Sequence, residues 1–409
     1  MANNLISSSP EEQRLAFLSL KSPRDVAKIL DYSYSGLVYH IYKTPDEEKY
    51  KIFEIPKKSG GMRLIASPSR PIKIIQGRLN EVLQNVYIPK PVTYGFIRER
   101  NIVQNAKRHQ KKNWVLNIDL ENFFPSINFG RVRGMFMGKP FRLPAPAATI
   151  LAQICCYKNE LPQGAPTSPI ISNMICAKLD SQLQDLAWQY KCFYTRYADD
   201  ITFSTTLLEF PSEIASVSPG FDVTLGNELE KIIKENGFDI NQKKTRAFPR
   251  HKRQEVTGLT VNKIPNVRRK YIMQIRAMLH DWENTDLESA QIKYATFESN
   301  QKYRNPESET PSFKQVVRGK INFLKMVKGS DNHIYKIFRE KLKYLSRRDK
   351  NIPLANIPSV VERQIIIYTE GITDKLILQT AWKKLHSEEE FPYKIVTIQP
   401  YRCSNETLL

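Results

Sequence analysis

The sequence predicts an α+β protein made of several domains. Segments with helical periodicity alternate with short runs of β-forming residues, which is typical of mixed folds. A chain of 409 residues suggests two or three domains of about 150 residues each. Hydrophobic residues make up 41% of the chain, enough for sizeable packed cores, and this excludes an intrinsically disordered protein.

The elements follow from two periodicities. Apolar residues recur at helical spacing, with a helix start at Ser22-Pro23, and predict helices within 10–45 and at 71–88, 147–157, 170–188, 225–236 and, mostly, 268–350. Runs of β-forming residues predict strands at 50–55, 62–65, 114–118, 193–196, 201–204, 238–240 and 256–261. Residues 351–358, with two prolines and no charge, predict a linker. A final βαβ unit is expected from a strand at 364–368, a helix at 375–385 and a strand at 393–398.

The charge predicts a polyanionic partner. There are 62 Lys and Arg against 42 Asp and Glu, a formal net charge of +20. From residue 351 onward acidic and basic residues nearly balance, so the excess lies earlier, with dense basic runs at 241–253, 263–270 and 339–350. One such run is usually a solvated surface, but three with interleaved aromatics favour a groove that follows phosphates. We therefore expect a nucleic acid as the partner.

Other classes of protein are disfavoured. No apolar run approaches the roughly 18 residues of a membrane helix, and the N-terminus lacks the basic and apolar stretches of a signal peptide. The five cysteines form no C-x-x-C pair, and their odd number argues against a disulfide framework. We expect a cytoplasmic protein with no membrane partner.

Three carboxylates are the strongest chemical signal. Asp119 follows one predicted strand, and Asp199 and Asp200 lie on the turn of a predicted hairpin. Two-metal phosphoryl transfer needs carboxylates from adjacent strands that converge on two ions roughly 3.5–4 Å apart. An isolated Asp-Asp pair is more often a turn or a helix cap. The flanking β-forming residues and the upstream Asp119 favour the metal site.

Four segments resemble the motifs of reverse transcriptases in order and spacing: Asn117-Ile118-Asp119-Leu120, the loop Leu161-Pro162-Gln163-Gly164-Ala165-Pro166-Thr167-Ser168-Pro169, Tyr197-Ala198-Asp199-Asp200, and Gly237 to Thr245. Two more are similar to elements of retron reverse transcriptases: Asn105-Ala106-Lys107-Arg108-His109 and Val256-Thr257-Gly258. The resemblance covers residues 10–350. It implies a right-hand polymerase fold of fingers, palm and thumb.

The resemblance also implies a division of the chain and a function. The expected parts are N-terminal helices and fingers at 1–110, palm with part of the fingers at 111–262, a basic helical thumb at 263–350, the linker, and a partial Toprim-like segment at 359–409. The implied activity is an RNA-directed DNA polymerase that copies its own structured noncoding RNA. It would prime from an internal 2′-hydroxyl and yield a branched RNA–DNA product (msDNA) that stays bound. An effector protein and a role in anti-phage defence are implied as well.

The family's site residues carry over to positions in this sequence. Asp119, Asp199 and Asp200 would hold two Mg²⁺ ions, for which Mn²⁺ can substitute, with the Leu120 carbonyl as a further ligand. Four residues would surround the incoming dNTP: Lys57, Arg63, Phe124 and Gln163. Phe124 would crowd a 2′-hydroxyl, and Gly164 would let backbone approach closely. Simpler alternatives stay open. Lys57 and Arg63 would then be exposed charges on a hairpin. A phenylalanine shortly after a strand is usually a core residue, which applies to either Phe124 or Phe123.

Contacts to RNA or primer are implied for a further set: Asn105, His109, Lys243, Lys244, Arg246, Val256, Thr257, Gly258, Arg268, Arg269 and Lys270. Lys244 would contact the primer strand, and 256–258 would line its 3′ end. His109 would recognise a structured RNA, support that surface, or be an ordinary helix histidine. A helix carrying Arg318, Lys320, Lys325 and Lys328 would face an RNA minor groove or solvent.

The last segment resembles the opening of a Toprim domain, in which Glu370 follows a strand and Asp374 begins a helix. A glycine turn with an aspartate cap explains these residues equally well. No Asp follows Asp374, so the second motif of that family is missing. We therefore expect a partial module, either a truncated effector or a degenerate docking unit, without nuclease catalysis.

Two other functions stay open. A group II intron-like reverse transcriptase or maturase would share most motifs, but the chain lacks a basic, Cys-rich endonuclease tail and carries the Asn-Ala-x-x-His element. A non-catalytic RNA-binding scaffold would keep the fold without the chemistry. The three aspartates argue against it.

Overall fold

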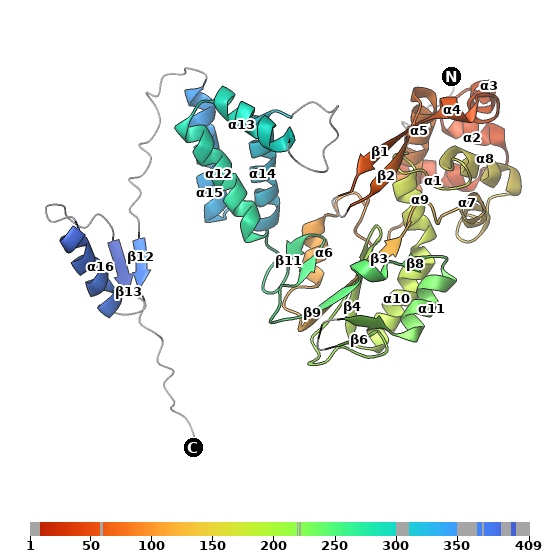
Figure 1. The fold of residues 1–409 in the computed structure, drawn as a ribbon. Helices are drawn as coiled ribbons and strands as arrows, with labels where there is room; N and C mark the ends of the chain where they lie inside the picture. Colours follow the sequence, from red (N-terminus) through yellow and green to blue (C-terminus); the bar gives the residue numbers. More distant parts are fainter. Residues whose placement is uncertain are drawn as a thin grey trace. The chain divides into compact units, whose positions relative to one another are not determined.

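The computed structural model describes residues 9–57, 60–218, 220, 222–299, 311–349, 366–369, 372–385 and 394–397 (Figure 1). The chain divides into two compact units, residues 1–345 and 346–409. In the described residues, no helix combines the length and the apolar character needed to cross a membrane.

The N-terminal helices are α1 (Pro10–Leu18), α2 (Pro23–Ile29), α3 (Tyr34–Val38), the π-helix η2 (Tyr39–Lys43) and α4 (Asp46–Lys49). Ser22 and Asp25 form a capping box, with Pro23 at the first helical position, as the Ser-Pro signal predicts. Ser9 and Glu12 cap α1 in the same way. These side chains satisfy backbone N–H groups that a helix start leaves without a partner, which fixes where each short helix begins.

An antiparallel hairpin follows, formed by β1 (Tyr50–Pro56) and β2 (Met62–Pro68). It leads into α5 (Arg70–Val86), which buries Ile72, Ile75, Leu79 and Leu83 along one face. The predicted hairpin and helix are both confirmed. The next helix is α6 (Ile102–Arg108), capped by Asn101.

The central sheet has the order β4-β5-β3-β8, and β9 also pairs with β3. All its pairs are antiparallel. Its strands are β3 (Trp114–Glu121), β4 (Cys192–Tyr197), β5 (Asp200–Thr205), β8 (Asp239–Ile240) and β9 (Arg246–Pro249). The middle of the chain also forms α7 (Phe129–Met137), α8 (Ala145–Cys155), α9 (Ser168–Ile175), α10 (Ala177–Gln189), α11 (Asn227–Glu235), the 3-10 helix η3 (Gln242–Lys244) and the small hairpin of β6 (Ala215–Val217) and β7 (Val223–Leu225).

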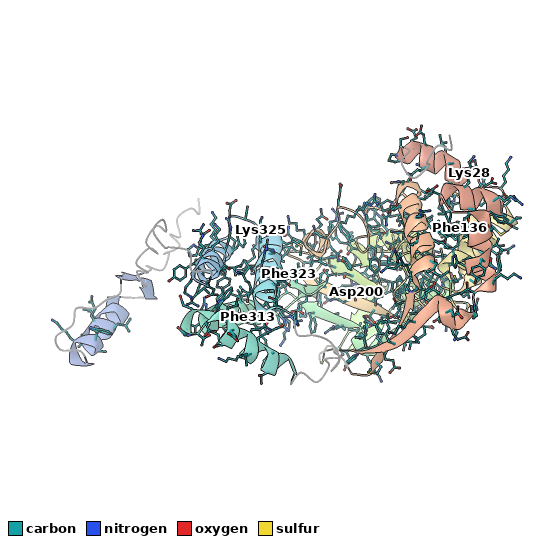
Figure 2. The ribbon with its side chains drawn as sticks, turned by 90° about the horizontal axis from the view of Figure 1, so that it is seen from above. Lys28, Phe136, Asp200, Phe313, Phe323 and Lys325 are labelled. Carbon is teal, nitrogen blue, oxygen red and sulfur yellow. The ribbon has the colours of Figure 1, made fainter. Side chains whose placement is uncertain are left out.

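One large hydrophobic core joins the N-terminal helices, α5, α7 to α11 and one face of the sheet. Phe136 of α7 and Phe17 of α1 are completely buried in it, with ring centroids 6.1 Å apart. Figure 2 labels Phe136 among these helices and Asp200 in the sheet. This core supports the strands that carry the predicted carboxylates.

Several boundaries differ from the sequence prediction. Residues 170–188 form two helices, α9 and α10, that meet at Cys176. The sequence predicts a single helix here because both bury an apolar face and the periodicity continues across the break. Residues 256–261 form a hairpin rather than one strand, with β10 (Glu255–Val256) and β11 (Leu259–Thr260) joined by Thr257 and Gly258 at φ values of 47° and 81°. The helix predicted from Leu225 begins at Asn227, since Leu225 ends β7.

Four long helices form a second core, as the sequence predicts for this basic region. They are α12 (Arg269–Asn284), α13 (Leu287–Ser299), α14 (Phe313–Lys328) and α15 (His333–Arg348). Trp282, Phe313, Leu324 and Leu345 are buried between them, and Figure 2 labels Phe313 and Phe323 on α14. Residues of α6, β3, β10 and β11 also belong to this core.

The second unit contains a βαβ arrangement. Strands β12 (Ile366–Thr369) and β13 (Lys394–Thr397) pair in parallel, and α16 (Ile372–Leu385) connects them. The predicted βαβ unit is therefore confirmed. The linker at 351–358 and Glu370 lie outside the described residues, and Asp374 falls in the first turn of α16.

Candidate active site

Strand pairing brings the three aspartates together. In the antiparallel register of β3 and β5, Asp119 lies directly opposite Asp200. Asp199 occupies the turn between β4 and β5, and its carbonyl accepts a hydrogen bond of 3.0 Å from the Leu120 N–H. Asp119 does not end its strand, since β3 continues to Glu121. The predicted convergence arises because β3 and β5 are neighbours, although their residues are far apart in sequence.

Burial and neighbouring negative charge raise the pKa of two of the aspartates, Asp199 and Asp200. Burial, followed by repulsion from Asp199 and Asp119, raises the pKa of Asp200 to about 7. The pKa of Asp199 is also raised, mainly by burial, with a contribution from Asp119. Negative charge is therefore concentrated in a partly dehydrated place, which disfavours the ionised forms unless a cation is near.

Three basic side chains partly offset this charge. The Lys244 ammonium lies 2.8 Å from Asp119 Oδ1. Arg63 of β2 opposes the rise in the pKa of Asp199, and Arg246 of β9 opposes that of Asp200. The structure thus places Arg63, Lys244 and Arg246 around the aspartates. Lys57, at the exposed end of the β1–β2 hairpin, has no recorded contact with them.

The donor set fits a divalent cation of the magnesium type, because carboxylate oxygens are the ligands such hard cations prefer. Within the described part of the chain, however, no three His, Cys, Asp or Glu side chains are arranged as a ready metal-ligand group. The Asp119 carboxylate is not free for a cation in this conformation, because it already pairs with the Lys244 ammonium. Mutual repulsion among the aspartates is the observation that favours a cation here.

A buried network below the Asp199–Asp200 turn was not predicted. The Arg196 guanidinium, completely buried, donates to both oxygens of Asp180 at 2.7 Å. It also donates to the Ala198 carbonyl at 3.1 Å and to Asn173 Oδ1 at 3.0 Å. Ala198 has a φ of 58°, the left-handed region that non-glycine residues seldom adopt. Arg196 therefore holds the turn in an uncommon conformation. The sequence shows only that an arginine directly precedes the Tyr-Ala-Asp-Asp box, and nothing in it indicates that this side chain is buried.

The loop that contains Gln163 packs against the β1–β2 hairpin. The Ala66 N–H donates to the Gln163 carbonyl at 2.8 Å. Gly164 has a φ of 126°, and a Cβ there would lie 2.8 Å from the Ala66 carbonyl oxygen. This matches the close backbone approach expected of Gly164, and the partner is strand β2.

The two neighbouring phenylalanines differ in environment. Phe123 is buried and stacks on Phe238 with centroids 5.5 Å apart, so it is the core residue of the pair. Phe124 is half-buried, with its ring 5.3 Å from Phe123 and 6.2 Å from Phe96. Only Phe124 keeps a partly exposed ring.

Two polar residues among the predicted RNA contacts are buried. His109 is completely buried, and its ring nitrogens lie 2.7 Å from the hydroxyls of Thr195 and Ser204. Asn105 is also buried, and its Oδ1 has no hydrogen-bond partner. Direct recognition of RNA by either side chain is therefore excluded in this conformation. Support of the surrounding surface by His109 stays a prediction.

The other predicted contacts are spread over η3, β9, the β10–β11 hairpin and the start of α12. Val256 is buried, whereas Gly258 is exposed at the tip of the β10–β11 hairpin. Arg268 is held by the carboxylate of Glu255, which also pairs with Arg253 at 2.9 Å. Arg268 is nevertheless exposed to solvent, as are Lys243, Lys244, Arg246, Arg269 and Lys270. Leu120 is buried.

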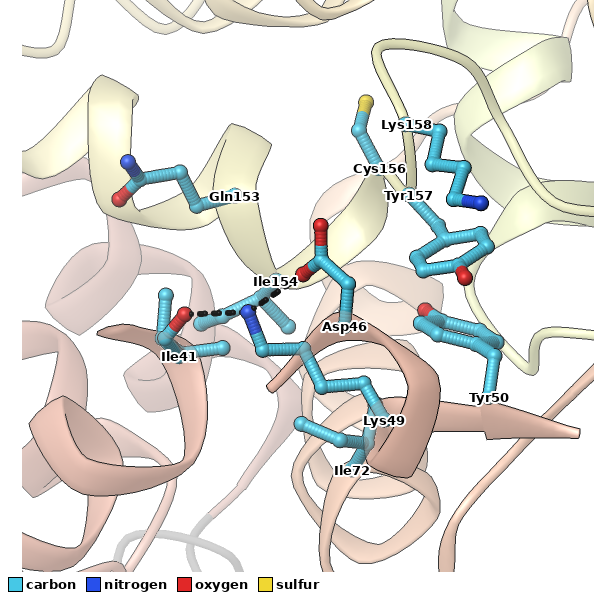
Figure 3. Close-up of a pocket in the computed structure, with 10 residues that line it drawn as sticks. All are labelled: Ile41, Asp46, Lys49, Tyr50, Ile72, Gln153, Ile154, Cys156, Tyr157 and Lys158. Carbon is cyan, nitrogen blue, oxygen red and sulfur yellow. Dashed lines mark hydrogen bonds and ion pairs between the residues drawn. The ribbon is translucent and has the colours of Figure 1, made fainter. Parts of the chain in front are cut away.

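A small pocket of about 70 Å³ beside β1 has a structural role (Figure 3). Lys49 donates to the Ile41 carbonyl at 2.8 Å and pairs with Asp46 at 2.9 Å. The rings of Tyr50 and Tyr157 lie 4.2 Å apart. Burial raises the pKa of the Cys156 thiol to about 12, which disfavours a reactive thiolate. These contacts anchor the start of β1.

Comparison with known families defines the class of protein. Residues 55–262, just over half of the chain, match the family described as "Reverse transcriptase (RNA-dependent DNA polymerase)". The chain therefore belongs to the reverse transcriptase family and is an RNA-directed DNA polymerase. The predicted enzyme class and the polymerase fold are confirmed.

Curated relatives narrow the class to retron enzymes. Retron Mx65 reverse transcriptase of Myxococcus xanthus is 33% identical over 330 residues, covering 74% of each chain. Retron Ec86 reverse transcriptase of Escherichia coli is 37% identical over 261 residues, covering 63% of this chain and 76% of the relative. Within the family, this chain is a retron-type reverse transcriptase. A solved telomerase from Candida albicans matches with a TM-score of 0.38 and 10% identity over 74% of this chain and 61% of that one, too weak a likeness to support an argument.

Proposed function

We propose that this enzyme reverse-transcribes its own structured noncoding RNA from an internal 2′-hydroxyl, and that the resulting branched RNA–DNA molecule stays bound. The observation that carries the proposal is the register of β3 and β5, which sets Asp119 opposite Asp200 beside Asp199. We further propose that the product serves anti-phage defence together with an effector protein. The retron enzymes among its relatives support this assignment over a group II intron enzyme.

The proposed catalytic residues are the three aspartates. They would hold two Mg²⁺ ions, with the Leu120 carbonyl as an added ligand. When bound, such ions lower the pKa of a primer hydroxyl and neutralise a leaving pyrophosphate. Lys244 pairs with Asp119 at 2.8 Å and, being partly exposed, would contact the primer strand.

The proposed dNTP site lies where the β1–β2 hairpin meets the Gln163 loop. Arg63 is near enough to affect Asp199 and would contact the triphosphate, with Lys57 at the hairpin end. Gln163 would contact the nucleotide or template, and the half-buried Phe124 would exclude a 2′-hydroxyl. The backbone contact between Ala66 and Gln163 fixes the hairpin against this loop.

We assign the N-terminal helices and fingers to residues 1–110, the palm with part of the fingers to 111–262 and the thumb to 263–350. On α14, Arg318, Asn322 and Lys325 are exposed, while Val317, Ile321 and Leu324 are buried. This polar stripe is suited to phosphate and 2′-hydroxyl contacts in an RNA minor groove. Residues 359–409 would form a partial Toprim-like segment without nuclease activity.

The test is a denaturing gel of nucleic acid that copurifies with the enzyme from cells carrying its native locus. Asp199→Asn removes one carboxylate charge, and Asp185→Asn on the exposed face of α10 is the matched control. A discrete band that shortens with ribonuclease, and is missing only in Asp199→Asn, would support the proposal. RNA alone in every sample would point to a scaffold, and a heterogeneous smear would contradict self-templated synthesis.

A further inference from the structure

A second pocket lies at the opposite end of the β4–β5 hairpin from the aspartates. It has a volume of about 330 Å³ and is lined by the ends of α6, α10 and β5 and the start of β4. Strand β4 begins beside this pocket and ends at Tyr197, next to the Asp199 turn. At about 3.3 Å per residue, Phe193 and Tyr197 are roughly 13 Å apart, so the pocket is separate from the active site.

Two aromatic side chains of this pocket face solvent. Trp188, near the end of α10, is 82% exposed, and Phe193 of β4 is 43% exposed. Large aromatic rings are usually packed, because each buries much apolar area. Both residues line the same pocket. Together they offer flat apolar surface on which a planar group can stack.

Cations surround these rings without acidic partners. Arg108 and Lys191 line the pocket, and the Lys112 ammonium lies 3.4 Å from the Phe193 ring centroid. No Asp or Glu lines the pocket, and across the described chain no recorded ion pair involves any of the three cations. Partial burial is the main cause of the lowered pKa of Lys112, and repulsion from the nearby Arg108 adds to it. An anion would relieve this repulsion.

We propose that this pocket binds an unpaired segment of single-stranded RNA, with a base stacked on Trp188 and its phosphates contacting Lys191 and Arg108. Aromatic faces combined with cations are the usual means of holding single-stranded nucleic acid. The absence of carboxylates from the lining favours a polyanion over a protein partner of mixed charge. RNA is the occupant because the enzyme copies RNA. The proposal therefore rests on the family activity and not on the roles assigned to the aspartates.

The test measures binding of a fluorescein-labelled 12-nucleotide single-stranded RNA to the full chain by anisotropy. Saturating unlabelled primer–template fills the polymerase groove, so the remaining signal reports other sites. Trp188→Ala is compared with Tyr39→Ala, an exposed aromatic in η2, and Lys191→Gln with Lys28→Gln on α2. Trp188→Phe keeps a ring. Primer extension on a generic template reports whether each variant keeps its active site.

Trp188→Ala is expected to weaken RNA binding by about fivefold or more, because one base stack is lost. Trp188→Phe and Tyr39→Ala should bind nearly as tightly as the parent. Lys191→Gln should reduce the slope of log K against log salt by about 0.7, the value for one phosphate contact to a single strand, and Lys28→Gln should not. Primer extension should be unchanged in all variants.

Equal RNA binding by the parent and Trp188→Ala would overturn the proposal. The proposal would also be overturned if Trp188→Ala weakened binding of a DNA 12-mer of the same sequence but not of the RNA. The pocket would then serve the DNA product. If Trp188→Ala fails to fold, the salt slope of Lys191→Gln decides alone. Loss of primer extension in Asp199→Asn bears only on the proposed function, so the two ideas fail separately.

Discussion

Arg196 and Asp180 form a completely buried ion pair directly beneath the turn that carries Asp199. The guanidinium and the carboxylate make two hydrogen bonds of 2.7 Å. The Tyr194 hydroxyl and the Thr93 hydroxyl donate to the same carboxylate at 2.7 and 2.8 Å. Both oxygens of the Asp180 carboxylate therefore accept two hydrogen bonds each. A buried charge pair is tolerated when its polar atoms have such partners.

Removing one member of this pair should be costly. Asp180→Ala is expected to lower the free energy of unfolding by about 3–5 kcal/mol, because it leaves a buried guanidinium uncompensated. Urea unfolding of the purified protein measures the change. Asp46→Ala breaks the partly exposed pair with Lys49 and should cost about 1 kcal/mol or less. If both variants lose the same unfolding free energy, burial does not make the Asp180–Arg196 pair more important for stability than the exposed pair.

Phe124 is expected to govern the choice of sugar. Phe124→Val should raise ribonucleotide incorporation by roughly tenfold or more, since a steric gate of this kind is worth about 1–3 kcal/mol. Single-nucleotide extension with dNTP and rNTP measures the ratio of kcat/KM. Phe123→Ala is the control: it should cost about 3–5 kcal/mol of stability without changing the ratio. Discrimination that survives in Phe124→Val would place the gate elsewhere.

His109 should make stability depend on pH. Burial lowers its pKa from 6.5 to about 3 in the folded state. The unfolded chain therefore binds more protons between these values, so stability is fully present above pH 6.5 and is lost as the pH falls toward 3.

Between pH 7.5 and pH 5, His109 should account for a loss of about 2 kcal/mol in unfolding free energy. His109→Gln should remove that part of the pH dependence, as measured by urea unfolding at both pH values. His251→Gln, at an exposed position, should retain it. If His109→Gln keeps the full pH dependence of the parent's unfolding free energy, His109 is not a buried neutral imidazole.

Gly164 should be intolerant of any side chain. Gly164→Ala places a Cβ 2.8 Å from the Ala66 carbonyl at a φ of 126°, so either the loop or β2 must move. We expect a loss of at least about 1 kcal/mol in stability and a higher KM for dNTP. Gly61→Ala is the matched control, because Gly61 also has a positive φ but no atom within 4 Å of its added Cβ. A similar KM change in both variants would rule out the contact with Ala66 as the cause.

Local patterns were sufficient for much of the fold. The β1–β2 hairpin and the strands around Asp199 were predictable because alternation and turn residues act over a few positions. The meeting of Asp119 and Asp200 was inferred from motif order, and the register of β3 and β5 agrees with it.

The remaining features depend on residues that are distant in sequence. The Arg196 network joins Thr93, Asn173 and Asp180, and no local pattern indicates that an arginine will be buried. The burial of His109 depends on Thr195 and Ser204. The exposure of Trp188 could not be foreseen from α10 alone, because a tryptophan near a helix end is equally compatible with packing.

Strand β3 also links the chemistry to the helices that follow it. Val115 belongs to the core formed with α12 to α15, whereas Leu116, Ile118 and Leu120 belong to the other core. Side chains alternate along a strand, so Val115 lies on the same face as Asp119, four residues away. Exchanging the helices of this enzyme for those of a relative would therefore alter the packing beneath the strand that bears Asp119. A chimaera would need to transfer Val115 and its neighbours together with the helices to keep that carboxylate in place.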